Sequence, residues 1–423
     1  MDDRLVKLKK PKNLLDLPIE VMPTPARVFI PLQQHKGLPA IPVVKKGETV
    51  KIGSKIGEAN GSVSANIHAS VSGRVVDIKL HPHPNLRESW CCIIETDYAN
   101  NLAQEFSDFD FYSLRPEELL NKIEEAGIVG LGGGGYPTAQ KLRAAMTREL
   151  NLLLINGCES EPNLTADYRI MLEYPEKVIE GAKIIQKILD VPKMIFVFTK
   201  RYQKAAELFK KKGVQVRVFA DSYPLGAERL LLKEFTKIVL PYDKLPIDAG
   251  VVVHNVNTCY AIYQAIKSGK PLIERVVTIS GDAINKPKNL LVKIGTPVRE
   301  IIQYCGGLRR NLKKIIFGGV MTGNAQFSLD TPVIKTTPGI VFQDTIMNEE
   351  TRDCVQCGKC IDVCPVGIFP AMIYRTIRRG QFEEAPKYGL NECLECGSCA
   401  YICPAFIPLV HYFKYARLRN VAG

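Results

Sequence analysis

Eight of the thirteen cysteines in this chain of 423 residues fall into two copies of one pattern near the C-terminus. Each copy has the spacing Cys-x2-Cys-x2-Cys-x3-Cys-Pro, and the copies comprise Cys354, Cys357, Cys360 and Cys364, and Cys393, Cys396, Cys399 and Cys403. Thiolates are soft ligands, and three of them on one tight loop can hold three corners of an iron–sulfur cubane. The fourth ligand of each cubane must come from elsewhere in the chain.

The cysteine that precedes proline can supply this fourth ligand. In two-cluster ferredoxins it binds the other cluster rather than its own. We therefore assign two [4Fe–4S] clusters, one to Cys354, Cys357, Cys360 and Cys403, the other to Cys393, Cys396, Cys399 and Cys364. The alternative is a pair of structural zinc sites, which are usually built from two well-separated Cys-x2-Cys hooks. The pattern thus indicates a protein that transfers single electrons.

The remaining composition narrows the class of protein. An odd total of thirteen cysteines and thiolate ligation argue against a secreted disulfide scaffold. No apolar run approaches the roughly 18 residues of a membrane-spanning helix, so any membrane attachment should be indirect. The formal net charge of +12 is dispersed and comes with no nucleic-acid-binding motif. It predicts an acidic protein partner or an anionic membrane surface, or is simply carried by solvated lysines.

A glycine-rich segment, residues 130–135, provides a second chemical feature. It satisfies the spacing G-x-G-x-x-G, but the dinucleotide-binding fingerprint requires a strand directly before it. Here Pro116–Ala126 predicts a helix instead, with proline at its start and Gly127 after its end. The glycines still let backbone N–H groups approach a phosphate at the start of the next helix, where Lys141 adds a counter-charge.

The elements that position these residues follow from the hydrophobic pattern. Residues 1–26 predict a polar arm, and residues 27–98 a compact β module of valine-rich runs broken by glycines. Residues 99–270 alternate helix and strand, which predicts a mostly parallel sheet covered by helices. A second β-rich module covers 271–340, and 341–423 hold the cysteines. The strands expected in the alternating part are Leu152–Asn156, Met194–Thr199, Val214–Phe219 and Gly250–His254.

Four segments in the alternating part resemble the FMN- and NADH-binding elements of the flavoprotein subunit of complex I. They are the glycine segment, the acidic turn Asn156–Pro162, the segment Tyr223–Glu228, and Asn255–Thr258. The resemblance implies that the glycines hold the FMN phosphate and ribityl chain, while Tyr136 and the acidic turn lie beside the nicotinamide nucleotide. The residues it assigns to FMN and NAD(H) are Gly130, Gly132, Gly133, Gly135, Tyr136, Lys141, Asn156, Glu159, Glu161, Tyr223, Gly226, Glu228, Asn255 and Thr258.

The chain departs from complex I at three of these segments. Leu131, Cys158 and Ala227 stand where complex I has a basic residue, an acidic residue and a glutamate. With its ferredoxin-like cysteine pair, the chain is more similar to the C subunits of the Rnf complex, a ferredoxin:NAD+ oxidoreductase. This resemblance implies a multidomain α/β fold: a barrel-sandwich hybrid at 27–98, a complex-I-like FMN/NADH domain at 99–270, a β-grasp module at 271–340 and a two-cluster ferredoxin-like domain at 341–423.

The same resemblance implies the activity and the partners. A nicotinamide exchanges two electrons as hydride and a cluster exchanges one, so a flavin must stand between them. The expected partners are NADH or NAD+, membrane subunits of an ion-translocating complex, and a ferredoxin-like cluster subunit, with no nucleic acid. We expect a peripheral position on the cytoplasmic face of the membrane. Two alternatives remain open: a soluble NADH-dependent electron-transfer flavoprotein of the kind associated with proline reductase, and a cluster-binding scaffold without flavin.

Overall fold

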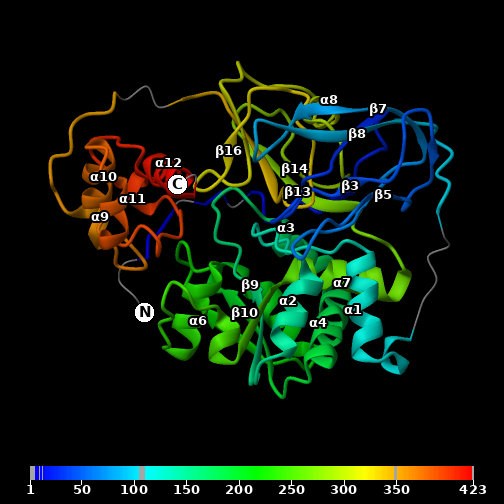
Figure 1. Cartoon of the computed structure of the whole chain (residues 1–423), viewed down its shortest axis with the longest axis horizontal. Helices are drawn as coiled ribbons and strands as arrows, with labels where there is room; N and C mark the ends of the chain where they lie inside the picture. Colours follow the sequence, from blue (N-terminus) through cyan, green and yellow to red (C-terminus); the bar gives the residue numbers. More distant parts are fainter. Residues whose placement is uncertain (1–4, 9, 12, 104–109, 347–349, 422–423) are drawn as a thin grey trace.

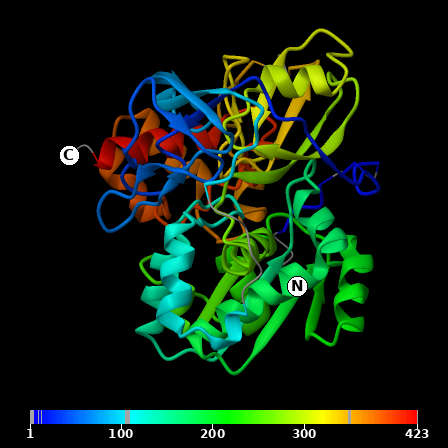
Figure 2. The same cartoon turned by 90° about the vertical axis from the view of Figure 1, so that its right-hand side faces the viewer.

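A computed structural model describes residues 5–8, 10–11, 13–103, 110–346 and 350–421 of the chain. Positions 1–4, 9 and 12 of the expected N-terminal arm therefore lie outside the described residues. The chain forms four parts (Figure 1). The α/β domain lies below, the barrel-sandwich module and the β-grasp module lie side by side above it, and the cysteine-rich part packs at one end. Figure 2 shows the same two β modules resting on the α/β domain from another side.

The α/β domain is built on a four-stranded sheet in the order β11-β10-β9-β12, in which every neighbouring pair is parallel. β9 is buried along its whole length, as expected for a strand covered on both faces. The strands are β9 (Leu152–Gly157), β10 (Met194–Thr199), β11 (Val216–Phe219) and β12 (Val251–Asn255). The predicted parallel sheet is confirmed, with strand ends shifted by one or two residues.

Helices cover both faces of this sheet. The predicted helix before the glycine segment is confirmed as α1, and it ends where Ala126 caps it and Gly127 takes a left-handed conformation. The helices are α1 (Pro116–Glu125), α2 (Thr138–Met146), α3 (Ala166–Glu173), α4 (Pro175–Leu189), α5 (Gln203–Lys211), α6 (Glu228–Thr236) and α7 (Val256–Ser268). The short 3₁₀ turn η2 (Lys200–Tyr202) follows β10. Loops at the carboxyl ends of the parallel strands face the other three parts, where α/β sheets usually bind ligands.

The barrel-sandwich module consists of two small antiparallel sheets. One has the order β2-β8-β7-β4 and the other β3-β5-β6, and Val28, Ile30, Val75 and Ile94 fill the interior. Its strands are β2 (Arg27–Pro31), β3 (Ile41–Pro42), β4 (Thr49–Val50), β5 (Lys55–Glu58), β6 (Ile67–His68), β7 (Gly73–Pro82) and β8 (Glu88–Thr96). The tip of the long β7–β8 hairpin reaches the β-grasp module, where Gln326 donates a hydrogen bond to the Pro84 carbonyl.

The β-grasp module has a six-stranded sheet in the order β1-β14-β13-β17-β15-β16. Its edge strand β1 (Ile19–Val21) belongs to the N-terminal segment and runs parallel to β14. Residues 19–21 of the expected arm thus form an integral strand, which pairs backbone groups of β14 that an open edge would leave exposed. The other elements are β13 (Glu274–Gly281), β14 (Lys288–Lys293), α8 (Val298–Tyr304), β15 (Lys314–Phe317), β16 (Asn324–Ala325) and β17 (Gly339–Gln343).

The cysteine-rich part repeats one small unit. In each copy a helix of a single turn begins directly after the second cysteine, and a left-handed glycine, Gly358 or Gly397, starts it. At these positions φ is 77° and 81°, a conformation that glycine adopts without strain. The helices are α9 (Lys359–Asp362), α10 (Pro370–Arg378), α11 (Ser398–Tyr401) and α12 (Leu409–Val421). They enclose a separate apolar core that includes Ile373, Leu390 and Phe413.

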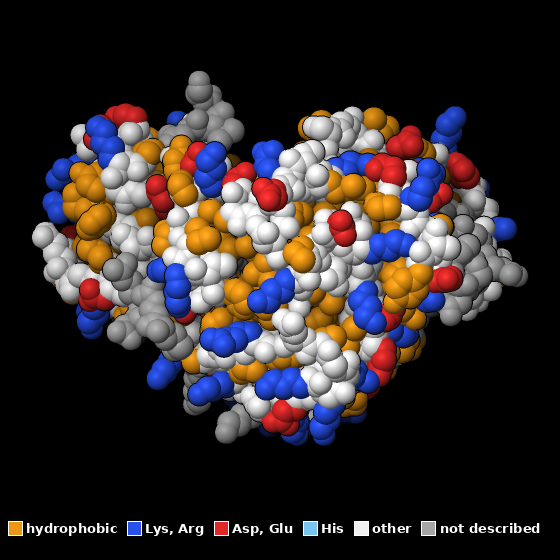
Figure 3. Space-filling view, turned by 90° about the horizontal axis from the view of Figure 1, so that it is seen from below, with side chains coloured by type: hydrophobic (Ala, Val, Ile, Leu, Met, Phe, Trp, Pro, Cys, Tyr) orange, Lys and Arg blue, Asp and Glu red, His pale blue; other side chains and the backbone are white. Residues whose placement is uncertain are grey.

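Two properties are relevant to membrane association: the distribution of surface charge and the length and hydropathy of the helices. Figure 3 shows lysine and arginine side chains scattered over the lower face, interrupted by acidic and apolar side chains. This arrangement matches the dispersed charge that the sequence predicts. Over the described ranges, no helix combines the length and the apolar character that crossing a membrane requires.

Candidate functional site

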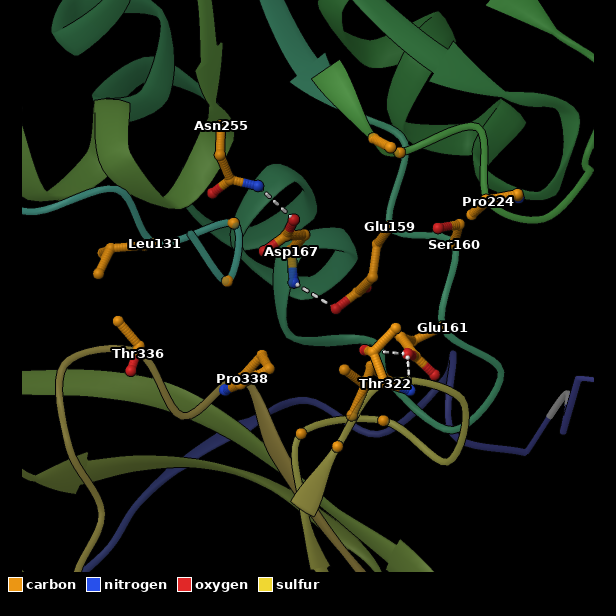
Figure 4. Close-up of a pocket in the computed structure, with 18 of the residues that line it drawn as sticks. Leu131, Glu159, Ser160, Glu161, Asp167, Pro224, Asn255, Thr322, Thr336 and Pro338 are labelled. Atoms are coloured by element: carbon orange, nitrogen blue, oxygen red, sulfur yellow. Dashed lines mark hydrogen bonds between the residues drawn. The ribbon is translucent and has the colours of Figure 1, made fainter. Parts of the chain in front are cut away.

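All four parts of the chain contribute to one cavity of about 300 Å³. It lies at the carboxyl ends of β9 and β12, and Figure 4 shows its labelled residues arranged around a common space. Its volume is at the lower end of the range of small-molecule sites. Eight of the residues assigned to FMN and NAD(H) line it: Gly132, Gly133, Asn156, Glu159, Glu161, Tyr223, Gly226 and Asn255.

The glycine segment forms one wall of this cavity. Its ends are joined because the Gly130 N–H donates to the Tyr136 carbonyl (2.8 Å) and the Gly135 N–H to the Gly130 carbonyl (3.0 Å). A Cβ atom at Gly133 or Gly134 would meet no other atom within 4 Å, so this stretch of backbone faces open space. An open stretch of glycine backbone just before helix α2 fits the phosphate and ribityl chain of FMN.

Six of the assigned residues do not line the cavity. Thr258 is fully buried and accepts a hydrogen bond from the Leu131 N–H (3.0 Å), so it fixes the glycine segment from behind. Lys141 donates to the Glu228 carboxylate (2.6 Å) and to the Val253 carbonyl (2.7 Å). Tyr136 is 41 % exposed. Gly130 and Gly135 close the loop. Three of the six, Thr258, Gly130 and Gly135, therefore hold the glycine segment in place.

The acidic turn places two carboxylates in the cavity wall. Glu159 is 9 % exposed and accepts a hydrogen bond from the backbone N–H of Asp167 (3.3 Å), which is itself 8 % exposed. Asp167 accepts hydrogen bonds from the side-chain amides of Asn255 (2.6 Å) and Asn257. Burial raises the pKa of both carboxyl groups, and repulsion by Asp167 raises that of Glu159 further. The charge on Asp167 therefore disfavours ionisation of Glu159.

Asp167 was not among the residues assigned from the sequence. A signal was available, because it is an acidic residue in the first turn of α3, directly after the acidic turn. Acidic residues are common at helix starts for electrostatic reasons alone, so position does not identify a functional one. Only the tertiary contacts with Asn255 and Glu159 show that it belongs to the site.

The β-grasp module supplies the opposite wall. The carboxylate of Glu161 accepts hydrogen bonds from the Met321 N–H (3.1 Å), the Thr322 N–H (3.0 Å) and the Thr322 hydroxyl (2.5 Å). The approach requires glycine at position 319, where a Cβ would overlap the Glu161 carboxylate. Burial raises the pKa of Glu161, and these donors counteract the shift. A second loop from this module, with Thr336 and Pro338, was also missed from the sequence.

The eight patterned cysteines are all in the cysteine-rich part. Four of them, Cys364, Cys393, Cys396 and Cys399, line one small cavity, which is the ligand set that the crossed pattern assigns to one cluster. In the other set, Cys354 and Cys357 lie close enough to Cys360 for their charges to interact. No three His, Cys, Asp or Glu side chains of the described residues are grouped to bind a single metal ion. A cubane does not need such a group, since each thiolate binds a different iron.

The two sites share a wall. Cys396 and Leu394 line the large cavity, and Cys396 lines the small one as well. Tyr223 is 2 % exposed, lines the large cavity and hydrogen-bonds to the cysteine loop. Cys357, in the other ligand set, is exposed to solvent. The remaining five cysteines, Cys91, Cys92, Cys158, Cys259 and Cys305, are buried.

Four family models match successive segments of the chain. They describe an RnfC barrel sandwich hybrid domain (residues 6–99), a Nuo51 FMN-binding domain (123–264), an SLBB domain (276–325) and a 4Fe-4S dicluster domain (346–404). Among solved structures, the NAD+-reducing [NiFe]-hydrogenase in its H2-reduced state has a similar fold, with a TM-score of 0.53 at 17 % identity. That similarity covers 71 % of this chain and 62 % of the hydrogenase chain.

Three curated relatives, all of them C subunits of oxidoreductase complexes, are similar over most of their length. The relative from the proton-translocating ferredoxin:NAD(+) oxidoreductase complex of Clostridium ljungdahlii is 43 % identical, over 97 % of this chain and 92 % of the relative. The one from the ion-translocating oxidoreductase complex of Rhodobacter capsulatus is 39 % identical, over 94 % of this chain and 79 % of the relative. The one from the Na(+)-translocating ferredoxin:NAD(+) oxidoreductase complex of Acetobacterium woodii is 35 % identical, over 88 % of this chain and 86 % of the relative.

Proposed function

The chain belongs to the family of C subunits of ion-translocating ferredoxin:NAD+ oxidoreductase (Rnf) complexes, and from this premise we propose how its residues serve electron transfer between NAD(H) and iron–sulfur clusters. Its cofactors are FMN and [4Fe–4S] clusters. The observation that carries the proposal is the shared wall. The loop of Cys396 borders both the large cavity and the small cavity of its own ligand set.

The large cavity would hold FMN and, over it, the nicotinamide. Bound FMN supplies the exchange between a hydride and single electrons. The open backbone at Gly133 and Gly134 would bind its phosphate, because N–H groups before a helix favour an anion. Thr258 would hold that backbone in place. Since Glu228 neutralises Lys141, we assign most of the phosphate binding to the backbone and a smaller share to Lys141.

The acidic turn would have two separate tasks. Asn156 donates to the Gly226 carbonyl (2.9 Å), which joins the turn to the segment around Tyr223. Three donors of the β-grasp loop already bind Glu161, so we assign this residue to holding that loop against the cavity. Glu159 and Ser160 then remain as the polar side chains of the turn that face the nucleotide. The β-grasp module thereby sets the width of the cavity.

The position of the cysteines orders the two clusters. The set with Cys396 would hold the cluster next to the large cavity, and the set with the exposed Cys357 would hold the outer one. Electrons would enter or leave the protein at the outer cluster, where a partner can approach. We propose that this partner is another subunit of the complex, either the ferredoxin-like cluster subunit or a membrane subunit.

Cysteine variants test this order. We expect about one FMN and about eight iron atoms per chain, four in each cluster. Cys357→Ala should lose the outer cluster, and Cys396→Ala the inner one, while NADH still bleaches the flavin in both. NADH should then reduce the remaining cluster at the normal rate only in Cys357→Ala. If Cys396→Ala reduces its remaining cluster equally fast, the order is wrong.

We also propose that the chain acts at the cytoplasmic face of the membrane, attached through other subunits. The names of its relatives as subunits of ion-translocating complexes support this. In the native host, moderate salt should lower the amount of protein recovered with membranes but not abolish it, since salt screens charge contacts but not apolar ones. Recovery in the soluble fraction with every other subunit present would contradict the proposal and favour a soluble reductase.

A further inference from the structure

We propose that Glu159 and Asp167 form a proton-accepting pair for the flavin, and that Asn257 and Arg275 connect this pair to a second cavity that leads toward solvent. This inference rests on the proposed function and adds a route for protons to it. It concerns side chains that the electron path leaves without a task. The supporting observations are the position of the pair, its surroundings, and the cavity behind it.

The need for a proton acceptor follows from counting. A hydride carries two electrons and one proton to the flavin, and the clusters remove the two electrons singly. One proton per hydride must therefore leave the flavin when NADH is oxidised, and one must return when NAD+ is reduced. A base in the cavity wall can take this proton if it lies within hydrogen-bond reach of the flavin or one water away.

Few described side chains in the cavity wall can serve as this base. Glu161 is held by three donors of the β-grasp loop, and Tyr223 donates its hydroxyl hydrogen to the Cys396 carbonyl. Cys158 is buried, and burial raises the pKa of its thiol. Glu159 and Asp167 remain, and Figure 4 shows Asp167 between Asn255 and Glu159 at the back of the cavity. Their position makes them the available acceptors.

A tyrosine hydroxyl and two guanidinium groups surround the Glu159–Asp167 pair. The Tyr202 hydroxyl donates to the Glu159 carbonyl (3.0 Å) and lies 3.4 Å from its carboxylate. Arg201 from η2 faces Glu159, and Arg275 from β13 faces both acids. The charge of Asp167 raises the pKa of Glu159, while Arg201 lowers the pKa of Glu159 and Arg275 that of Asp167. These opposing charges let the pair bind a proton and release it again.

A second small cavity lies behind the pair. Leu131 lines both cavities, so they adjoin at this residue. Asn257 hydrogen-bonds to Asp167 and also lines the second cavity, as does Arg275. The Nη2 atom of Arg275 is buried without a hydrogen-bond partner among the described residues. Such an orphaned donor is a place for an ordered water.

The outer end of this second cavity is polar and partly exposed. Gln264 and the ion pair of Lys270 with Glu274 line it, and all three side chains reach partial solvent exposure. A chain of waters could therefore run from Asp167 past Asn257 and Arg275 to this rim. Leu131 is the one described residue that lines both cavities, so the rest of this route lies outside the cavity that would hold the nucleotide.

Two variants test the pair and the route. Asp167→Asn removes the carboxylate, and Gln264→Leu makes the outer rim apolar without touching the flavin cavity. In stopped-flow measurements with a pH-indicator dye, NADH should bleach the flavin within about threefold of the normal rate in Gln264→Leu, while proton release in Asp167→Asn is compared with that variant's own rate of bleaching. Release of the proton to solvent should slow at least about tenfold in Asp167→Asn and at least about threefold in Gln264→Leu. Glu176→Gln, an exposed change elsewhere, is the control.

A second readout does not depend on turnover. The pH dependence of the flavin midpoint potential should bend where the pair titrates in the parent protein, and Asp167→Asn should shift or remove this bend. An unbent curve in the parent protein, or proton release unchanged in both variants, would overturn the inference. Loss of FMN or of bleaching by NADH in the parent protein would instead contradict the proposed function. Flavin content and circular dichroism show whether a variant is folded. If Asp167→Asn fails to fold, the rate of proton release in Gln264→Leu tests the proposed route.

Discussion

The hydroxyl of Tyr223 donates a hydrogen bond of 2.5 Å to the backbone carbonyl of Cys396, 173 residues further along the chain. Tyr223 belongs to the wall of the large cavity, and Cys396 to the loop that we propose binds the inner cluster. Burial raises the pKa of the Tyr223 hydroxyl far above its usual value, so it remains a donor at all physiological pH values. This bond ties the flavin domain to the cysteine-rich part at the point where electrons are expected to cross.

Tyr223→Phe should loosen this connection without removing either cofactor. The lost bond is worth about 1 kcal/mol, and the unpaired Cys396 carbonyl adds to the cost. We expect NADH to bleach the flavin at the normal rate and reduction of the inner cluster to slow by about fivefold. Stopped-flow spectroscopy separates the two steps. Tyr242→Phe, at an exposed tyrosine, is the matched control, and equal effects of both changes would contradict the prediction.

The crossed ligation predicts which cluster each cysteine holds. Cys364→Ala should remove the inner cluster although Cys364 belongs to the first sequence repeat, because it shares a cavity with Cys393, Cys396 and Cys399. Iron should fall from about eight to about four atoms per chain. Electron paramagnetic resonance should then show the same remaining signal as in Cys396→Ala. A signal that matches Cys357→Ala instead would mean that each repeat binds its own cluster.

The cavity lining predicts a preference for NADH over NADPH. No lysine or arginine occurs among the described residues that line it, so nothing there can pair with a 2′-phosphate. The nearest basic residues in sequence are occupied: Arg143 by Glu117 and Glu124, and Arg169 by Glu173. NADH should reduce the flavin at least about tenfold faster than NADPH at equal concentrations. Ser160→Arg should narrow the difference, and equal rates in the parent protein would refute the prediction.

Lys335 predicts a pH-dependent stability. It is fully buried and donates to the Asn66 carbonyl (2.6 Å) and the Gly127 carbonyl (2.7 Å), so it joins three parts of the chain. Burial lowers its pKa to about 7. In the unfolded chain it stays protonated up to about pH 10.4. Between these values the unfolded state binds the extra proton, so the free energy of unfolding should rise with pH by about 1 kcal/mol per unit.

Lys335→Met tests this contribution. The variant should lose the pH-dependent term above pH 7 and should be destabilised by about 1–3 kcal/mol, because two buried carbonyls lose their donor. Thermal unfolding at pH 6.5 to 9.5 measures the difference in free energy of unfolding (the gap) between the parent protein and the variant. The gap should widen as pH rises through this range, and parallel curves would show that Lys335 does not titrate there.

Local features of the sequence predicted the cluster ligands and determined the types of element. The spacing of Cys354, Cys357 and Cys360 dictates a tight loop of thiolates whatever surrounds it. The helix before the glycine segment and the parallel strands follow from periodicity and from proline and glycine signals, which depend on neighbouring residues only. The resemblance to complex I then indicated which segments should meet, because these segments share an order along the chain.

Only the tertiary structure decided which side chains lie together in the site. The contact of Glu161 with Thr322 spans 161 residues, and that of Tyr223 with Cys396 spans 173. Asp167 resembles any acidic residue at a helix start until Asn255 and Asn257 are seen to bind it. Such contacts depend on how separate modules pack against each other. Short-range patterns set the shape of each module, but packing between modules depends on the complementarity of whole surfaces, which no local spacing encodes.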